Sequence, residues 1–283
     1  MGTVVNHPNP TRAASAPGRT TKVKNTREDG NQPDVEFEVV RLCARTDRSS
    51  SERDSLRKLI KQGVSWRKVA FISEVHGVRP LVFYELERAA PDLVSDEIRQ
   101  GVQQYLRKIQ IHNSFLVNEL GRLSDALRDR DIPAISIKGP LLAKVAYENI
   151  HLRRYTDLDV LIPPDRFSEV EQLLLQGDYR PFPKVQNLTG LRKKFYLYLS
   201  GQWPFVRGRG AFNLDLHTQV MPPGYTFQRR FEPLWERSQE VHLTEDVTVR
   251  GLAPEDMLLM LAFHGVKNQW SLLKYASDIT ELI

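Results

Sequence analysis

Hydrophobic positions in the first part of the chain recur with a helical period. Residues 51–62 open with serine and acidic residues and then place Leu56, Leu59 and Ile60 on one face. Residues 65–78 and 79–90 predict two more short helices, separated around Gly77. Residues 96–130 predict a long helix, because their apolar positions keep a spacing of about 3.6 residues. We therefore expect a helical N-terminal domain over residues 51–130.

At Asp131 the pattern changes to short β-rich runs that alternate with helices. Residues 132–139 predict a strand that ends in Lys138 and Gly139, and Pro140 then suits the first position of a helix over residues 140–150. Further strands are predicted at 157–162, 202–206, 211–220 and 247–252, and further helices at 165–176 and 226–238. Residues 254–283 are helical again. The pattern predicts an α/β core over residues 131–252 and a C-terminal helical region over residues 253–283.

The net charge of +5 comes from the start of the chain. Residues 1–27 hold five basic residues and no acid, which leaves 35 Lys and Arg against 35 Asp and Glu in the rest. Residues 1–50 are poor in apolar side chains, so we predict a disordered basic tail. The balanced charge of residues 28–283 argues against a nucleic-acid partner, since such binding depends on clustered cations.

The remaining composition indicates an ordinary cytoplasmic protein. Hydrophobic residues make up 41% of the chain, and no stretch approaches the roughly 18 consecutive apolar residues of a membrane helix. Cys43 is the one cysteine, so an internal disulfide is excluded, which fits a reducing compartment. We expect neither a membrane span nor a reactive thiol.

Two aspartates in one predicted strand need an explanation. Asp157 and Asp159 alternate with Leu158 and Val160, so both carboxylates point to the same face. At about 6 to 7 Å apart they repel each other unless a cation lies between them, and such oxygen ligands suit Mg²⁺. Asp215, in the later strand, is placed to reach the same point, and three such acids can hold two metal ions for phosphoryl or nucleotidyl transfer. An Asp-x-Asp pair alone is weak evidence, because such pairs also cap loops or face solvent.

The order of these motifs resembles the nucleotidyltransferase superfold of DNA polymerase beta. More closely, the chain resembles the uncharacterised nucleotidyltransferase family of bacteria, through the segments WRKVAFISEVHGVRPLVFYEL, IKGPLLAKVAYENIHLRRYTDLDVLI, LDLH and HGVKNQWSLLKYASDI. These segments lie within residues 51–283. The resemblance implies an α+β fold, with a small mixed sheet and helices of nucleotidyltransferase type flanked by helical regions at both ends.

The resemblance also implies roles for particular residues. Asp157 and Asp159 would bind the two Mg²⁺ ions, and Asp215 would complete the metal nearest the acceptor and help generate its alkoxide. Gly139 would let the backbone approach the triphosphate at a helix N-terminus. Pro140 departs from the usual Gly-Ser or Gly-Gly pair and offers neither a hydroxyl nor an N–H group.

Other residues are candidates for binding the nucleotide. Lys138 and Arg154 are the nearest cations, and Arg154 could equally pair with the aspartates. His217 lies two residues after Asp215, where it could assist proton transfer or hydrogen-bond an aspartate. In the last helix, Trp270, Lys274 and Asp278 are spaced by four and predict one stripe. Lys274 and Asp278 would meet a phosphate and a ribose hydroxyl, although a solvated charge pair beside a packed tryptophan explains the spacing too.

Three classes of function fit these features. The favoured one is a Mg²⁺-dependent transfer of a nucleoside monophosphate from an NTP, expected to be ATP, to a hydroxyl of a small molecule, peptide or protein. The second is a nucleotide-binding or interaction relative with weak or no catalysis, which Pro140 supports. The third is a nucleic-acid-directed transferase, which the balanced charge disfavours.

Overall fold

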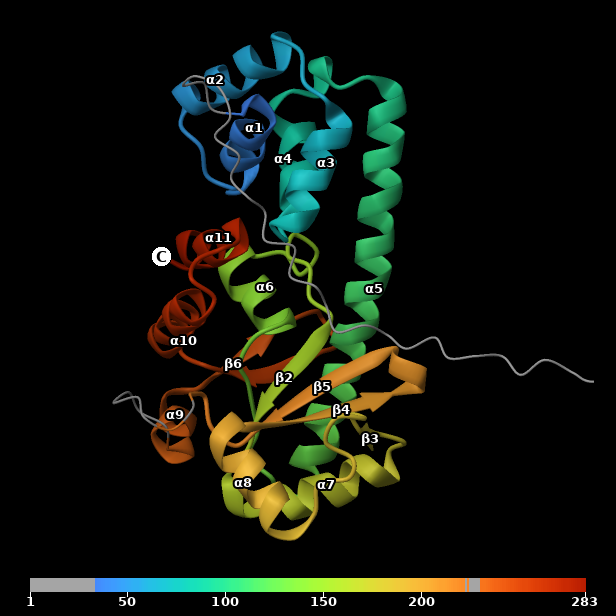
Figure 1. The fold of residues 1–283 in the computed structure, drawn as a ribbon, viewed down its shortest axis with the longest axis vertical. Helices are drawn as coiled ribbons and strands as arrows, with labels where there is room; N and C mark the ends of the chain where they lie inside the picture. The colour runs from blue at the N-terminus through green and yellow to red at the C-terminus, as the bar shows by residue number, and fades with distance from the viewer. Residues whose placement is uncertain (1–33, 222, 224–229) are drawn as a thin grey trace, which may run out of the picture. The chain divides into compact units, whose positions relative to one another are not determined.

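The computed structural model describes residues 34–221, 223 and 230–283 (Figure 1). The unit described here is Asp34–Ile283. Of the predicted disordered tail, residues 1–33 lie outside the described part. From Val35 onward the prediction was wrong, because residues 35–43 form a helix and bury Val39 and Val40 completely.

Helices alone make up the region before the sheet. The long α5 follows a cluster of shorter helices, and Ser49 begins α2 with a capping box in which its hydroxyl and the Glu52 carboxylate each accept from the other's backbone N–H. Their buried side chains, including Leu56, Val69, Val82 and Leu86, form one hydrophobic cluster. The elements are α1 (Val35–Cys43), α2 (Ser50–Lys61), α3 (Trp66–Val75), α4 (Arg79–Ala89), η1 (Pro91–Leu93) and α5 (Asp96–Arg128).

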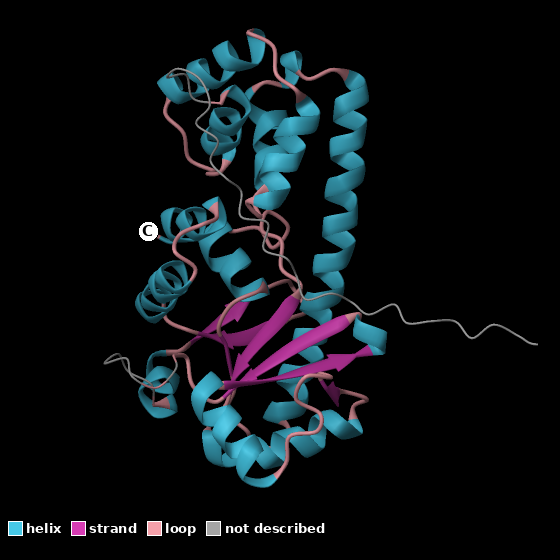
Figure 2. Ribbon diagram, viewed as in Figure 1, coloured by secondary structure: helices cyan, strands magenta, loops and turns pink. Residues whose placement is uncertain are grey.

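The described strands form one mixed sheet in the order β3-β4-β5-β2-β1-β7-β6 (Figure 2). β2 is parallel to β5 and β1 is parallel to β7, whereas the other neighbours are antiparallel. The strands are β1 (Ile135–Ser136), β2 (Asp157–Leu161), β3 (Arg180–Pro181), β4 (Gln202–Arg207), β5 (Phe212–His217), β6 (Gln239–His242) and β7 (Thr248–Gly251).

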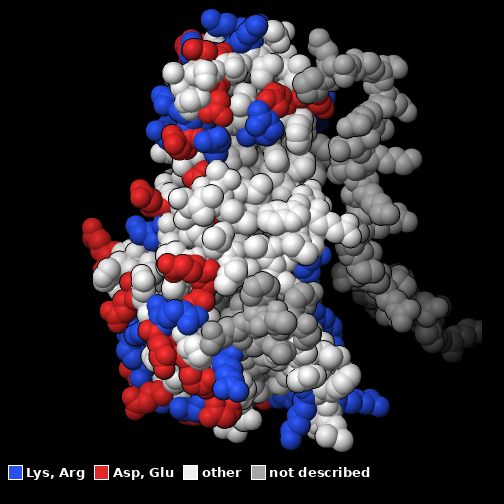
Figure 3. All heavy atoms as spheres, turned by 90° about the vertical axis from the view of Figure 1, so that its left-hand side faces the viewer, with Lys and Arg blue, Asp and Glu red and all other residues white. Residues whose placement is uncertain are grey.

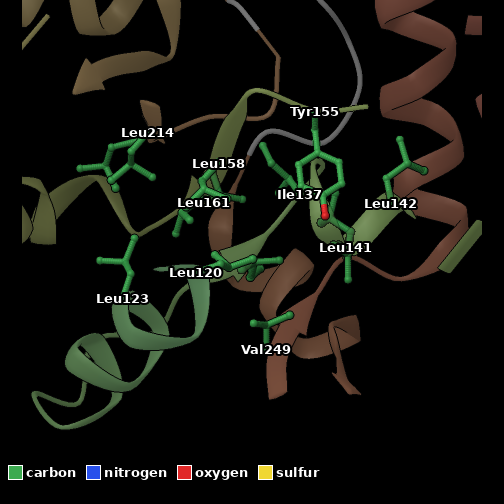
Figure 4. Close-up of a cluster of buried hydrophobic side chains, with 14 of the residues drawn as sticks. Leu120, Leu123, Ile137, Leu141, Leu142, Tyr155, Leu158, Leu161, Leu214 and Val249 are labelled. Atoms are coloured by element: carbon green, nitrogen blue, oxygen red, sulfur yellow. The ribbon is translucent and has the colours of Figure 1, made fainter. Parts of the chain in front are cut away.

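Helices pack around this sheet and enclose a second, larger core. Figure 4 shows Leu120 and Leu123 of α5 gathered with Leu158 of β2 and Val249 of β7. The remaining elements are α6 (Pro140–Tyr147), η2 (Pro164–Arg166), α7 (Phe167–Gln176), α8 (Gly190–Ser200), η3 (Gly208–Gly210), α9 (Phe231–Arg237), α10 (Pro254–Lys267) and α11 (Leu273–Leu282). The predicted α+β class, with a mixed sheet flanked by helical regions, is confirmed.

Several further elements differ from the prediction, among them the edge strand β3, which was not predicted. The helix predicted over residues 254–283 is broken between α10 and α11, where Gln269 and Trp270 adopt positive φ angles of 54° and 50°. Trp270 therefore lies in a turn, so the predicted stripe through Lys274 and Asp278 is not one helical face. α8 and the edge strand β6 were not predicted at all. Residues 226–229 of the predicted helix 226–238 lie outside the described residues. The domain boundaries at residues 130 and 252 stay a prediction.

No helix among the described residues is both long and apolar enough to cross a bilayer.

Candidate active site

The parallel pairing of β2 with β5 brings the predicted acids together. Asp159 lies directly opposite Asp215 in the register, and Asp157 lies opposite Asn213. Neighbouring strands are about 4.8 Å apart, and side chains two residues apart on a strand share a face. Asp157, Asp159 and Asp215 therefore occupy one face of the sheet, as the spacing predicted.

Asp159 is the most buried of the three, with 5% of its surface exposed. Its Oδ1 atom accepts a hydrogen bond from Lys138 Nζ at 3.2 Å and lies 2.9 Å from His217 Nε2. Burial alone would raise the pKa of Asp159, but Lys138 and His217 outweigh it and hold that pKa below its usual value. Asp159 is thus charged, with two cationic or donor groups on one of its oxygens.

The other two carboxylates are less well compensated. Burial and the charge of Asp159 raise the pKa of Asp157. Burial also raises the pKa of Asp215, with the two neighbouring aspartates adding to it and His217 acting against it. Gln202 Nε2 donates to Asp215 Oδ2 at 2.9 Å and so orients this carboxylate. Like charges gathered in a partly buried place are costly unless a cation joins them.

The donor atoms present fit a divalent cation. Ligand atoms of Asp159, Asp215 and His217 all lie within 4.8 Å of one another. Carboxylate oxygens are the ligands that Mg²⁺ prefers, and burial together with the neighbouring carboxylates raises the pKa of Asp157 and of Asp215, so a bound cation would stabilise their charged forms. This group contains His217, for which the sequence left open proton transfer or a hydrogen bond to an aspartate, and it does not contain Asp157, which begins β2.

Gly139 forms the turn between β1 and α6 that the sequence indicated. Its φ of +57° and ψ of −123° suit glycine, and Pro140 is the first residue of α6. A Cβ atom on Gly139 would lie 3.1 Å from the backbone oxygen of Asp157. The glycine therefore lets the turn pass close to the start of the acidic strand.

Three of the other predicted nucleotide ligands line one small pocket of about 10 Å³, which has room for about one water molecule. Arg154, Lys274 and Asp278 line it, together with Arg153 and Tyr147. Arg154 forms an ion pair with Glu74 rather than with the aspartates. Burial lowers the pKa of Lys274, with Arg153 adding to the effect, and among the described residues no carboxylate pairs with its Nζ atom. Its Nζ atom lies 5.2 Å from the centroid of the Tyr275 ring, so a bound anion would give this charge the ion-pair partner that the described residues do not supply.

Asp278 differs from the other candidates because its carboxylate is already fully engaged. It is 2% exposed, and its Oδ1 accepts hydrogen bonds from Tyr147 Oη and Arg153 Nε, each at 2.8 Å. Its Oδ2 accepts from a terminal nitrogen of Arg153 at 3.1 Å. The sequence did not indicate Arg153 as its partner, since 125 residues separate the two.

Further residues that sequence reasoning missed position the C-terminal helices. His76 Nδ1 accepts from the backbone N–H of Leu273 at 3.2 Å, and the His76 carbonyl accepts from that of Lys274. A Cβ on Gly77 would lie 2.9 Å from Lys274 Cδ, so this glycine lets the lysine pass. On α10, burial and the charge of Lys138 lower the pKa of His264 to about 3, which keeps this imidazole neutral.

Comparisons with known proteins identify the family of this chain. The model of a family described as "Uncharacterised nucleotidyltransferase" matches residues 62–283. Similar solved structures include a solution structure of the antibiotic-resistance factor ANT(2'')-Ia, with a TM-score of 0.43 and 13% identity over 60% of this chain and 83% of that one. A crystal structure of ANT(2")-Ia with adenylyl-2"-tobramycin has a TM-score of 0.40 and 14% identity over 59% and 89%. The lincosamide antibiotic adenylyltransferase LnuA, lincomycin-bound, has a TM-score of 0.39 and 18% identity over 58% and 94%. The comparison with curated proteins found no match.

Proposed function

The chain belongs to the uncharacterised nucleotidyltransferase family, and from this premise we propose a Mg²⁺-dependent transferase. It moves a nucleoside monophosphate from an NTP, taken to be ATP, to a hydroxyl of a small molecule, peptide or protein, and releases pyrophosphate. The observation that carries this proposal is the placement of Asp159 opposite Asp215 on parallel neighbouring strands, with Asp157 on the same face.

In this proposal, Asp157, Asp159 and Asp215 hold two Mg²⁺ ions. Bound Mg²⁺ would neutralise the triphosphate and lower the pKa of the acceptor hydroxyl. Asp215 faces the acceptor, and Gln202 fixes its orientation through Oδ2. The other oxygen of Asp215, Oδ1, assists removal of the hydroxyl proton.

The nucleotide is held by cations from different elements. Lys138 follows β1 and reaches Asp159, and Lys274 of α11 is a second cation, without a carboxylate partner among the described residues. Gly139 brings the backbone close to the start of β2, where the triphosphate would lie against the metals. Arg154 would have to leave Glu74 to take part. Asp278 acts by positioning Arg153 and α11 rather than by touching the ribose.

The acceptor is expected to be a small molecule or a peptide. ANT(2")-Ia is described in complex with an adenylylated tobramycin, and LnuA is named an antibiotic adenylyltransferase. The charge balance of residues 28–283 continues to disfavour a polynucleotide acceptor.

Mass spectrometry of a transfer reaction tests the proposal. The purified protein is incubated with each NTP, Mg²⁺ and pooled hydroxyl-bearing acceptors, and the products are searched for a nucleotide adduct and pyrophosphate. We expect an adduct with the wild-type chain and none with Asp159→Asn. A polynucleotide as the preferred acceptor would contradict the substrate class.

A second candidate is a nucleotide-binding relative without transfer activity. Pro140 favours it, since the first residue of α6 offers neither hydroxyl nor N–H to a phosphate. Binding of Mg²⁺ and ATP without pyrophosphate release under all acceptor conditions would identify this function.

A further inference from the structure

Helix α8 carries its apolar residues on the outside. Leu191, Phe195, Tyr198 and Leu199 are 84%, 64%, 59% and 49% exposed. Their spacing of i, i+4, i+7 and i+8 puts them on one face of the helix. A helix on the surface of a protein in water normally turns such a face inward.

The inward face of α8 is the more polar one and is well fixed. Lys193 pairs with Glu171 of α7 and lies over the ring of Trp203, 5.1 Å from its centroid. Tyr196 packs edge-on against the same ring at 5.5 Å. These contacts fix the orientation of α8. The exposure of its apolar face is therefore a property of the fold.

Cations border the exposed apolar face on both sides. With about 100° of rotation per residue, Arg192 falls beside Leu199 and Lys194 falls beside Tyr198 at the two edges of the face. Both are exposed, and among the described residues neither has an acidic partner. The surrounding sequence, residues 179–214, contains seven Lys or Arg residues and no Asp or Glu. In Figure 3, Lys and Arg side chains project together with uncharged ones at the lower right end, at the height of α8 in Figure 1.

We propose that α8 docks the protein onto an anionic lipid surface. An apolar face flanked by Lys and Arg is the pattern of a helix that lies in the headgroup region, with the aliphatic stems buried and the charges at the phosphates. Juxtamembrane cations gain further from the negative surface potential of such a membrane.

Charge argues against the other occupants. The segment 1–27 of the same chain carries five bases and no acid, so it would be repelled. A second copy that meets this face with its own α8 would bring like charges together. An acidic peptide has the right charge, but these residues project from one helix and do not line a groove, so it would bury only one side of itself.

Vesicle flotation tests the proposal with the full chain. We expect the wild type to float with phosphatidylcholine vesicles that contain phosphatidylglycerol, less so at high salt, and hardly at all with pure phosphatidylcholine. Phe195→Ser should lower the partition about tenfold, because the side chain no longer enters the apolar layer. The matched control is Phe71→Ser on α3, since Phe71 is 65% exposed and lies far from α8 in sequence.

Two double charge-reversal variants distinguish the cations of α8 from the positive charge of the chain as a whole. Arg192→Glu with Lys194→Glu should abolish flotation, whereas Arg107→Glu with Lys108→Glu, exposed on α5, should leave most of it. Equal flotation of the two double variants would overturn the proposal and assign the vesicle binding to segment 1–27. Absence of flotation overturns it too, as does binding of a polyglutamate peptide without binding of vesicles. If the wild type self-associates in sedimentation and Phe195→Ser does not, the apolar face is instead a contact between copies of the chain. Unchanged circular dichroism confirms that each variant folds.

Discussion

Two buried carboxylates in this molecule have opposite surroundings. Asp159 of β2 and Asp278 of α11 are 5% and 2% exposed. Asp278 has Arg153 on both oxygens and Tyr147 on one of them. Asp159 shares its strand face with two further carboxylates and has Lys138 and His217 on a single oxygen.

The difference separates a structural ion pair from a ligand site. A buried carboxylate that is paired and fully hydrogen-bonded needs no further ligand. Removing it would leave its charged partner buried and unpaired, which costs free energy of folding. A group with more negative than positive charge is stabilised when a cation binds. From the count of partners, rather than from burial, we therefore propose that Asp278 serves the fold and that the Asp159 group serves the chemistry.

The largest expected effect is on the acidic side. Asp159→Asn or Asp215→Asn should lower transfer by roughly 10³-fold or more, because several kcal/mol of metal-derived stabilisation are lost. Removal of one of three like charges should leave the fold intact. Steady-state rates and thermal melts of both variants check this, and near wild-type turnover in either would remove the residue from the metal site.

The opposite result is expected at Asp278. Asp278→Ala should cost about 3 to 5 kcal/mol of unfolding free energy, since Arg153 and Tyr147 lose their buried partner. Urea unfolding measures it. The control is the double substitution Arg153→Met with Asp278→Leu, which removes both charges and should recover much of the loss. A stable Asp278→Ala protein with weak NTP binding would instead make Asp278 a nucleotide ligand.

Lys274 lies one turn before Asp278. Its substitution should affect nucleotide binding, as for the acidic cluster, rather than stability, as for the Arg153–Asp278 ion pair. Lys274→Ala should weaken NTP binding by about 1 to 3 kcal/mol, as for the loss of a charged hydrogen bond, with little change in stability. Calorimetric titration of NTP with Mg²⁺ measures this, and Lys61→Ala on the exposed part of α2 is the control. Unchanged affinity would mean that the lysine only packs against Gly77.

The sequence was sufficient for the acidic strands and insufficient for the ion pair. Asp157 and Asp159 alternate with core residues, so a period of two fixes their common face, and the Leu-Asp-Leu pattern does the same for Asp215. The partner of Asp278 depends on how α11 meets the loop before β2, and no local pattern records that contact. The predicted stripe of Trp270 and Lys274 was wrong because a turn with positive φ angles interrupts the helix. α8 was missed because apolar and aromatic residues lie on both of its faces, with Leu191 and Phe195 outside and Tyr196 and Leu197 inside, which weakens its periodic pattern.

The smallest effect is expected at a residue that only orients the site. Gln202→Leu removes the donor to Asp215 Oδ2 and should lower kcat about tenfold, in the range found for groups that hold metal ligands. Binding of Mg²⁺ with NTP should weaken less than the rate. A rate equal to that of the wild type would show that Asp215 needs no such support.

Metal-dependent nucleotide binding tests the central claim most directly, because it needs no knowledge of the acceptor. Thermal melts are recorded with ATP alone, Mg²⁺ alone and both together, for the wild type, Asp159→Asn and Asp215→Asn. We predict that ATP and Mg²⁺ together raise the Tm of the wild type, as expected when a ligand binds only the folded state. The Tm of neither variant should change. An equal rise in Tm for the wild type and both variants would place the nucleotide elsewhere and contradict the assignment of the acidic cluster.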